Sequence, residues 1–191
     1  MTTQTTATTA ESEQGTRATP ASRFPIADFC AAMEAGDVDR ALENFTDDCL
    51  LRPLGTDHLR FEGKEATRDL VRAVLQVFER TNYHDRMLSD DEIWVRFKTF
   101  PEGIPFDGID CLKIDENGKC YQMDVMGRPQ FAQTIFTGKV ALRLRPQIGW
   151  FRKLLLTVLI PPLEWSQKLA ARLGPWLIQP GVPTAVRQRP E

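Results

Sequence analysis

One carboxylate stands among apolar residues in the segment FDGIDCLKIDENGKCYQMDVMGRP, residues 106–129. Read with a period of two, the segment places Asp110 on the more apolar face of a strand, together with Phe106, Leu112 and Ile114. A carboxylate withdrawn from water has a raised pKa and can act as a general acid or base near neutral pH. The same pattern fits a buried structural Asp that is hydrogen-bonded to a Tyr or an Arg. Both interpretations are carried forward.

His58 is the second candidate for acid/base chemistry. It lies in the loop GTDHLRFEG, between a short predicted strand, CLLRPLG, and a predicted helix. A His in this loop could shuttle protons or orient a carbonyl group, whereas an exposed loop His without a chemical role is the competing interpretation. Arg52, in the short strand, would pair with Asp110 or bind an anionic ligand group if it pointed inward. It would then lower the pKa of Asp110.

The composition fits one soluble domain with appended sequence. The chain has 191 residues, of which 42% are apolar and 26% charged. Four scattered cysteines form no CxxC motif and only two His are present, so we expect reduced thiols and neither a metal site nor a cofactor. The first residues show no signal-peptide pattern, and no apolar run reaches the ~18–20 residues of a membrane span. We therefore expect a cytoplasmic protein.

Order is predicted to begin after residue 22, because residues 1–22 are rich in Thr, Ser and Glu and contain little that could be buried. Apolar spacing predicts a first helix up to Gly36, a second over residues 38–45 and a third over residues 64–80. The period then changes to two in EIWVRFKTF, PFDGIDCLKI and GKCYQMDVM. Asn117-Gly118 between the last two predicts a hairpin. Helices followed by a meander indicate an α+β fold with helices on one concave face of a bent antiparallel sheet.

The order of AGDVDRALENFTDDCLL, FEGKEATRDLVRAVL and GIDCLKIDENGKCYQMDVMGRP resembles the nuclear transport factor 2-like superfamily, and within it the SnoaL-like group. The resemblance implies a cone-shaped α+β barrel over residues 23–130, in which three N-terminal helices pack on a strongly curved antiparallel sheet around a deep apolar pocket. Homodimers are common in this superfamily. Its members include ketosteroid isomerases, epoxide hydrolases, dehydratases, polyketide cyclases and non-catalytic binding proteins.

The resemblance also tests individual positions. Asp110 falls where ketosteroid isomerases carry the protonated Asp of the oxyanion hole. Their catalytic base would fall at Pro53, or at Arg52 with a shift of one residue, and their Tyr at Phe29. The usual isomerase mechanism is therefore not expected. The Asp-Arg-Asp set of epoxide hydrolases is not expected either, because Asp124 falls on the outer phase of its strand.

A pocket of this kind implies hydrophobic walls with a few polar groups. Tyr83 or Tyr121 could donate a hydrogen bond from the wall. The predicted substrate-binding residues are Phe29, Arg52, Phe97, Leu112, Tyr121, Met123 and Val125.

The C-terminal part of the chain differs in charge from the rest. Residues 139–191 hold nine basic and two acidic residues, a net charge of +7, which leaves −9 for residues 1–138. We predict a basic amphipathic helical extension over residues 131–180 and a flexible end over residues 181–191. Residues 148–180 combine Trp, Leu and basic residues, which suits a helix lying at a membrane surface. Packing across the pocket mouth or in a dimer is the alternative. Nucleic acid is not expected, because the basic residues are spaced through apolar sequence.

Two hypotheses follow for function. The first is a cyclase, isomerase or dehydratase that acts on a hydrophobic polyketide, terpenoid or steroid-like molecule, with Asp110 as acid/base and His58 or Tyr121 as an auxiliary. The second is a non-catalytic module that binds a hydrophobic ligand, with the tail docking on a membrane or forming a lid.

Overall fold

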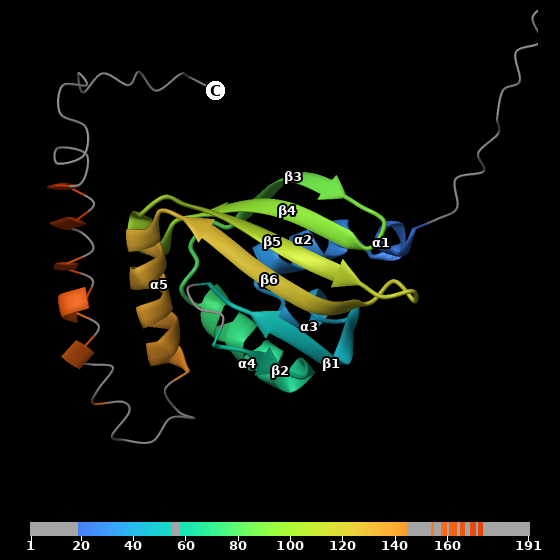
Figure 1. The fold of residues 1–191 in the computed structure, drawn as a ribbon, viewed down its shortest axis with the longest axis horizontal. Coiled ribbons are helices and arrows are strands. Elements are labelled where there is room, and N and C mark those ends of the chain that lie inside the picture. Colours follow the sequence, from blue (N-terminus) through green and yellow to red (C-terminus); the bar gives the residue numbers. More distant parts are fainter. Residues whose placement is uncertain are drawn as a thin grey trace, which may run out of the picture.

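The computed structural model of the chain describes residues 19–54 and 58–144, and helical positions 154, 158–159, 161–163, 165–166, 169–170 and 172–173. Its elements form a curved sheet with helices on one face (Figure 1). In chain order they are α1 (Pro20–Arg23), α2 (Ile26–Ala35), α3 (Val38–Ala41), β1 (Phe45–Arg52), β2 (Phe61–Glu62), α4 (Lys64–Leu75), β3 (Asn82–Leu88), β4 (Glu92–Thr99), a short 3-10 helix η1 (Pro101–Gly103), β5 (Phe106–Ile114), β6 (Cys120–Arg128) and α5 (Gln130–Arg143).

The six strands lie in the order β2-β1-β6-β5-β4-β3. Strands β3 to β6 form an antiparallel meander, and the predicted hairpin joins β5 to β6 through Gly118, whose φ is +79°. The predicted α+β fold class is confirmed, and the sheet is bent but not closed into a barrel. One pair departs from the antiparallel expectation: β1 runs parallel to β6. A parallel pair needs a crossover connection, which here is the whole segment between these two strands.

Three boundaries differ from the predicted ones. The second helix is one turn long, because Phe45 already belongs to β1. The third helix ends at Leu75, and the following turn places Phe78 against the same core, which is why the apolar spacing continues past the helix. Helix α1 begins within residues 1–22, the segment predicted to be disordered. Its Ala21 is fully buried and donates its backbone N–H to the carbonyl of Asp90 at 3.0 Å. Residues 1–18 lie outside the described residues.

Two glycines let aromatic rings lie flat on the concave face of the sheet. Gly108 pairs with Phe97 across β5 and β4, and a Cβ at Gly108 would lie 2.0 Å from the tip of the Phe97 ring. Gly127, beside Gly108 on β6, stands in the same relation to Phe106. The rings then form one continuous network with contacting centroids 4.8–6.4 Å apart, made of Phe24, Phe29, Phe45, Phe78, Tyr83, Phe97, Phe106 and Phe136.

Gly108→Ala should therefore lower the free energy of unfolding by about 1–3 kcal/mol, the usual cost of overpacking a core. Phe97 is buried and has to move to make room for the new methyl group. Urea denaturation measures the loss. The same substitution in a Phe97→Leu background should cost clearly less, because the ring that clashes is then absent. Equal costs in the two backgrounds would contradict the steric explanation.

Candidate functional site

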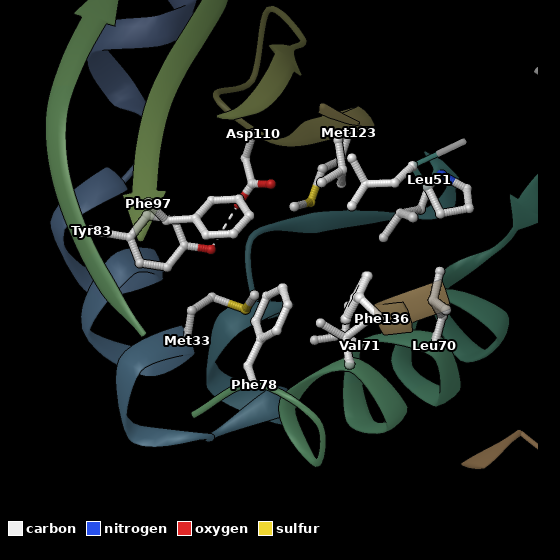
Figure 2. A pocket seen from close by; sticks show the side chains of 14 residues that line it. Met33, Leu51, Leu70, Val71, Phe78, Tyr83, Phe97, Asp110, Met123 and Phe136 are labelled. Atoms are coloured by element: carbon white, nitrogen blue, oxygen red, sulfur yellow. Dashed lines mark hydrogen bonds between the residues drawn. The ribbon is translucent and has the colours of Figure 1, made fainter. Parts of the chain in front are cut away.

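A cavity lies between the concave face of the sheet and helices α2, α4 and α5 (Figure 2). Its volume is about 40 Å³, and the empty space including the open mouth is about 430 Å³. Asp110 and Tyr83 are the two described lining residues whose side chains carry oxygen or nitrogen. The apolar lining residues are Met33, Leu51, Pro53, Leu54, Leu70, Val71, Val74, Phe78, Phe97, Met123, Val125 and Phe136.

Asp110 lies in the middle of β5, with Val95 of β4 and Val125 of β6 as its cross-strand neighbours. It is 2% exposed, so the charged form of its carboxyl group is poorly solvated. Burial raises the pKa of Asp110 to about 7, against a smaller lowering effect of its hydrogen bond with Tyr83. Both protonation states are therefore populated near neutral pH, which is the condition for general acid or base catalysis.

Tyr83 is the hydrogen-bond partner of Asp110. Its hydroxyl donates to Oδ2 of Asp110 at 2.7 Å, and the other carboxyl oxygen points away from Tyr83, toward Met123 (Figure 2). Burial, and next the charge of Asp110, raise the pKa of Tyr83 well above its ordinary value, so the phenol keeps its proton. A hydrogen bond joins β3 to α2 beside this pair: the carboxylate of Glu34 accepts it from the backbone N–H of Tyr83 at 2.6 Å.

The hydroxyl of this Asp–Tyr pair comes from β3 rather than from the first long helix. Phe29 of α2 packs edge-on against the ring of Tyr83, with centroids 6.1 Å apart, and the ring of Phe97 lies 5.4 Å away on the other strand. The resemblance put the Tyr of the isomerases at Phe29. In this chain Phe29 packs against Tyr83 instead, and Tyr83 donates the hydrogen bond to Asp110. The sequence named Tyr83 and Tyr121 as possible donors without a means of choosing between them.

The family model described as a SnoaL-like domain matches residues 26–123, slightly more than half of the chain. The chain belongs to the SnoaL-like family. The match ends within β6, so α5 and its Phe136, which form one wall of the cavity, lie beyond it.

Solved structures agree with this fold. A steroid delta-isomerase from Pseudomonas aeruginosa aligns with a TM-score of 0.60 at 22% identity, over 69% of this chain and 95% of that one. A cystatin-like-fold protein from Silicibacter pomeroyi aligns with a TM-score of 0.55 at 19% identity, over 64% and 83% of the two chains. At these identities the similarity concerns the fold alone. No curated protein sequence matches the chain.

Arg52 of this SnoaL-like domain points away from the cavity. It makes a bidentate ion pair with Asp124, its cross-strand neighbour on the outer face of the sheet. Burial alone would raise the pKa of Asp124, but hydrogen bonds from Arg52 and Gln122 hold it below the ordinary value. The predicted substrate-binding position of Arg52 is thereby corrected. Arg52 is not placed to lower the pKa of Asp110.

The other predicted site residues fall into three groups. Phe97, Met123 and Val125 line the cavity of the SnoaL-like domain, as predicted from the strand phase. Phe29 and Leu112 are buried in the core but are not among the lining residues, and His58 is exposed on its loop. Tyr121 is 42% exposed. A register shift between β5 and β6 leaves it without a partner on β5, which turns it out of the inward phase and corrects its predicted place in the pocket.

Thiol chemistry finds no support at this site. All four cysteines are free and buried, and burial raises the pKa of Cys30, which lies near Asp110, to about 11. Its thiol is therefore protonated at neutral pH and is a poor nucleophile. Within the described ranges, no group of three or more His, Cys, Asp or Glu side chains is arranged to hold a metal ion.

Proposed function

We propose that this SnoaL-like protein is a cofactor-independent acid/base enzyme of the isomerase, cyclase or dehydratase type that acts on a hydrophobic small molecule. The observation that carries the proposal is the buried Asp110, with a pKa of about 7, on the wall of an otherwise apolar cavity. Strongly perturbed carboxyl groups in cavities are typical of catalytic sites. The family membership and the isomerase among the structural relatives support the same class of chemistry.

In the proposed mechanism the charged form of Asp110 removes a proton from a carbon next to a carbonyl group, breaking a C–H bond and forming an O–H bond. In a β,γ-unsaturated ketone the electron pair moves onto the carbonyl oxygen and gives a dienolate. Asp110 then returns the same proton to the γ-carbon of this dienolate while the carbonyl group re-forms, so one carboxyl group serves as base and acid in turn. Tyr83 holds the carboxyl group in place through Oδ2, and the apolar walls exclude water from the reacting atoms.

The size of the cavity bears on the substrate class. Pockets for drug-sized ligands measure roughly 300–1,000 Å³, far more than the enclosed 40 Å³ here. Among polyketide, terpenoid or steroid-like molecules, the smaller ones fit best. A larger substrate requires side chains of the wall to move.

The test is proton transfer with small ketones. We expect the protein to accelerate deuterium exchange at the carbons next to the carbonyl of cyclohexanone in D2O, followed by NMR, and the conversion of 3-cyclohexenone to its conjugated isomer, followed by UV absorbance. Asp110→Asn should lower both rates by about 10²–10⁴-fold. With Asp110 as base, the rate should rise with pH through about 7. Tyr83→Phe should move this inflection to higher pH, because the hydrogen bond that lowers the pKa of Asp110 is lost.

The matched control is Asp107→Asn, which changes a carboxylate on the same strand that lies outside the cavity and pairs with Arg128. It should leave the rates unchanged. Equal losses for the Asp107 and Asp110 variants, or an Asp110→Asn variant as active as the wild type, would refute the catalytic role of Asp110.

One observation favours the alternative, a non-catalytic module for a hydrophobic ligand. Asp110 is the one carboxylate among the described lining residues, and Pro53 lines the cavity where the isomerase base was expected. Under this alternative cyclohexanone would raise the melting temperature of the protein without any deuterium exchange, and Asp110→Asn would have no rate to change.

A further inference from the structure

The C-terminal part of the chain exposes apolar side chains. Every described position between 154 and 173 is helical, and every described Leu, Val and Trp among them is between 40% and 68% exposed. Trp165 is the most exposed of these residues, at 68%. Scattered single apolar residues are normal on a protein surface, but a concentration of large ones in one segment marks an interaction site.

The spacing of these residues places many of them on one side of a helix. Val158, Pro162, Trp165, Leu169 and Leu173 follow one another at intervals of four, three, four and four residues. This is the interval pattern of a single helical face. The face does not belong to the core around the cavity, because its described members are all exposed. We call these five residues the C-terminal apolar face.

The sequence around this face is basic. Residues 143–173 hold six Lys and Arg against one acid, Glu164, and the described Arg172 is exposed. None of the helices that the described residues form is long and apolar enough to cross a bilayer. A helix with an apolar face that carries Trp and Leu, within basic sequence, suits the boundary between lipid headgroups and acyl chains.

A second copy of the chain is the rival occupant, because residues 1–138 are acidic. Some of these acids have internal partners in the described part of the chain. Ion pairs join Asp28 to Arg40, Asp39 and Glu65 to Arg68, Asp69 to Arg72, Asp85 to Arg96, Glu92 to Lys113 and Asp124 to Arg52. These pairs leave the net charge of −9 in place, so a second copy would meet the basic residues, but charge alone does not cover an apolar face. An anionic bilayer offers both unpaired phosphate groups and an apolar interior.

We propose that residues 154–173 bind the surface of an anionic lipid bilayer, with the C-terminal apolar face inserted below the headgroups and the basic residues of the segment 143–173 on lipid phosphates. This interaction is independent of the proton-transfer chemistry proposed for the cavity. It would hold the domain next to a lipid phase, where hydrophobic small molecules concentrate.

The experiment is sedimentation of the full chain with unilamellar vesicles of phosphatidylcholine alone or mixed with phosphatidylglycerol. We expect the protein to sediment with the mixed vesicles, to bind vesicles of phosphatidylcholine alone at least tenfold more weakly, and to be released from the mixed vesicles by high salt. The Trp165→Asp/Leu169→Asp double variant should bind the mixed vesicles at least tenfold more weakly. The control is Met87→Asp/Leu88→Asp, which changes two exposed apolar residues of β3 and should bind as the wild type does.

The folding of each variant is checked by its melting temperature, and its oligomeric state by analytical ultracentrifugation. Failure of the wild type to sediment with mixed vesicles, or undiminished sedimentation of the Trp165/Leu169 variant, would overturn the proposal. If the wild type is a dimer that does not bind vesicles, and the Trp165/Leu169 variant is a monomer, the C-terminal apolar face is instead a contact between copies of the chain.

Discussion

Asp110→Asn should be more stable than the wild type by about 4 kcal/mol at pH 8, and this advantage should disappear near pH 4. The folded protein holds the pKa of Asp110 at about 7, whereas an exposed Asp in the unfolded chain has an ordinary pKa near 3.8. Between these values the folded state keeps a proton that the unfolded state has lost. The wild type therefore loses about 1.4 kcal/mol of stability per pH unit from about pH 4 to about pH 7, and the loss is complete above that.

Urea denaturation of both proteins at a series of pH values measures this difference. Asn cannot ionise but can still accept a hydrogen bond from Tyr83, so the comparison isolates the burial of the charge. Asp107→Asn serves as the control for the loss of a carboxyl group that lies on the same strand but outside the cavity. A pH-independent difference for Asp110→Asn would mean that the carboxyl group is not desolvated, and the argument for its role as acid or base would lose its basis.

The stability that the protein loses by burying Asp110 indicates a functional role for this carboxyl group. A protein selected for stability alone would gain from replacing a buried carboxylate that has one neutral hydrogen-bond partner and no counter-charge. Arg52, the cation that the sequence suggested as a partner for Asp110, is paired with Asp124 on the other face of the sheet. Asp110 thus lies in an apolar cavity without Arg52 as a counter-charge. This arrangement shifts the pKa of a carboxyl group toward neutral pH.

Strand phase was the most informative feature of the sequence. The set Phe106, Gly108, Asp110, Leu112 and Ile114 is buried at every position in the structure, as the alternation predicted. The hairpin at Asn117-Gly118 followed from turn chemistry that depends on two adjacent residues only. Such patterns are local, and they hold because helices cover one face of the sheet (Figure 1).

The predictions failed where a register shift interrupts the alternation of a strand, or where a contact joins residues that are far apart in the sequence. The register shift that exposes Tyr121 has no signature in its own strand, because a bulge is defined against the neighbouring strand. Arg52 is among the predicted substrate-binding residues because nothing in its strand identifies Asp124 as its partner 72 residues away. The Tyr83–Asp110 contact likewise spans three strands and depends on Gly108 leaving room for Phe97, a relation that a single sequence does not encode locally.

Phe136→Ala should lower the free energy of unfolding by about 3–5 kcal/mol and should create a binding site for a small aromatic ring. The ring of Phe136 is nearly buried and stacks on Phe78, with centroids 4.8 Å apart, and on Phe106 at 6.1 Å. Its removal takes away one wall of the cavity that holds Asp110. Apart from Asp110 and Tyr83 the enlarged cavity has apolar walls, and apolar cavities of this size class take up benzene.

Differential scanning fluorimetry tests this expectation with and without benzene. Benzene should raise the melting temperature of Phe136→Ala by several degrees more than that of the wild type. Phe136→Leu, which keeps most of the volume, should lose little stability and should gain about as much from benzene as the wild type does. Wild-type stability in Phe136→Ala would contradict a wall formed by α5. Because α5 lies beyond the matched SnoaL-like region, a gain of binding in Phe136→Ala would mean that this chain limits the size of its own ligands with an element added outside that region.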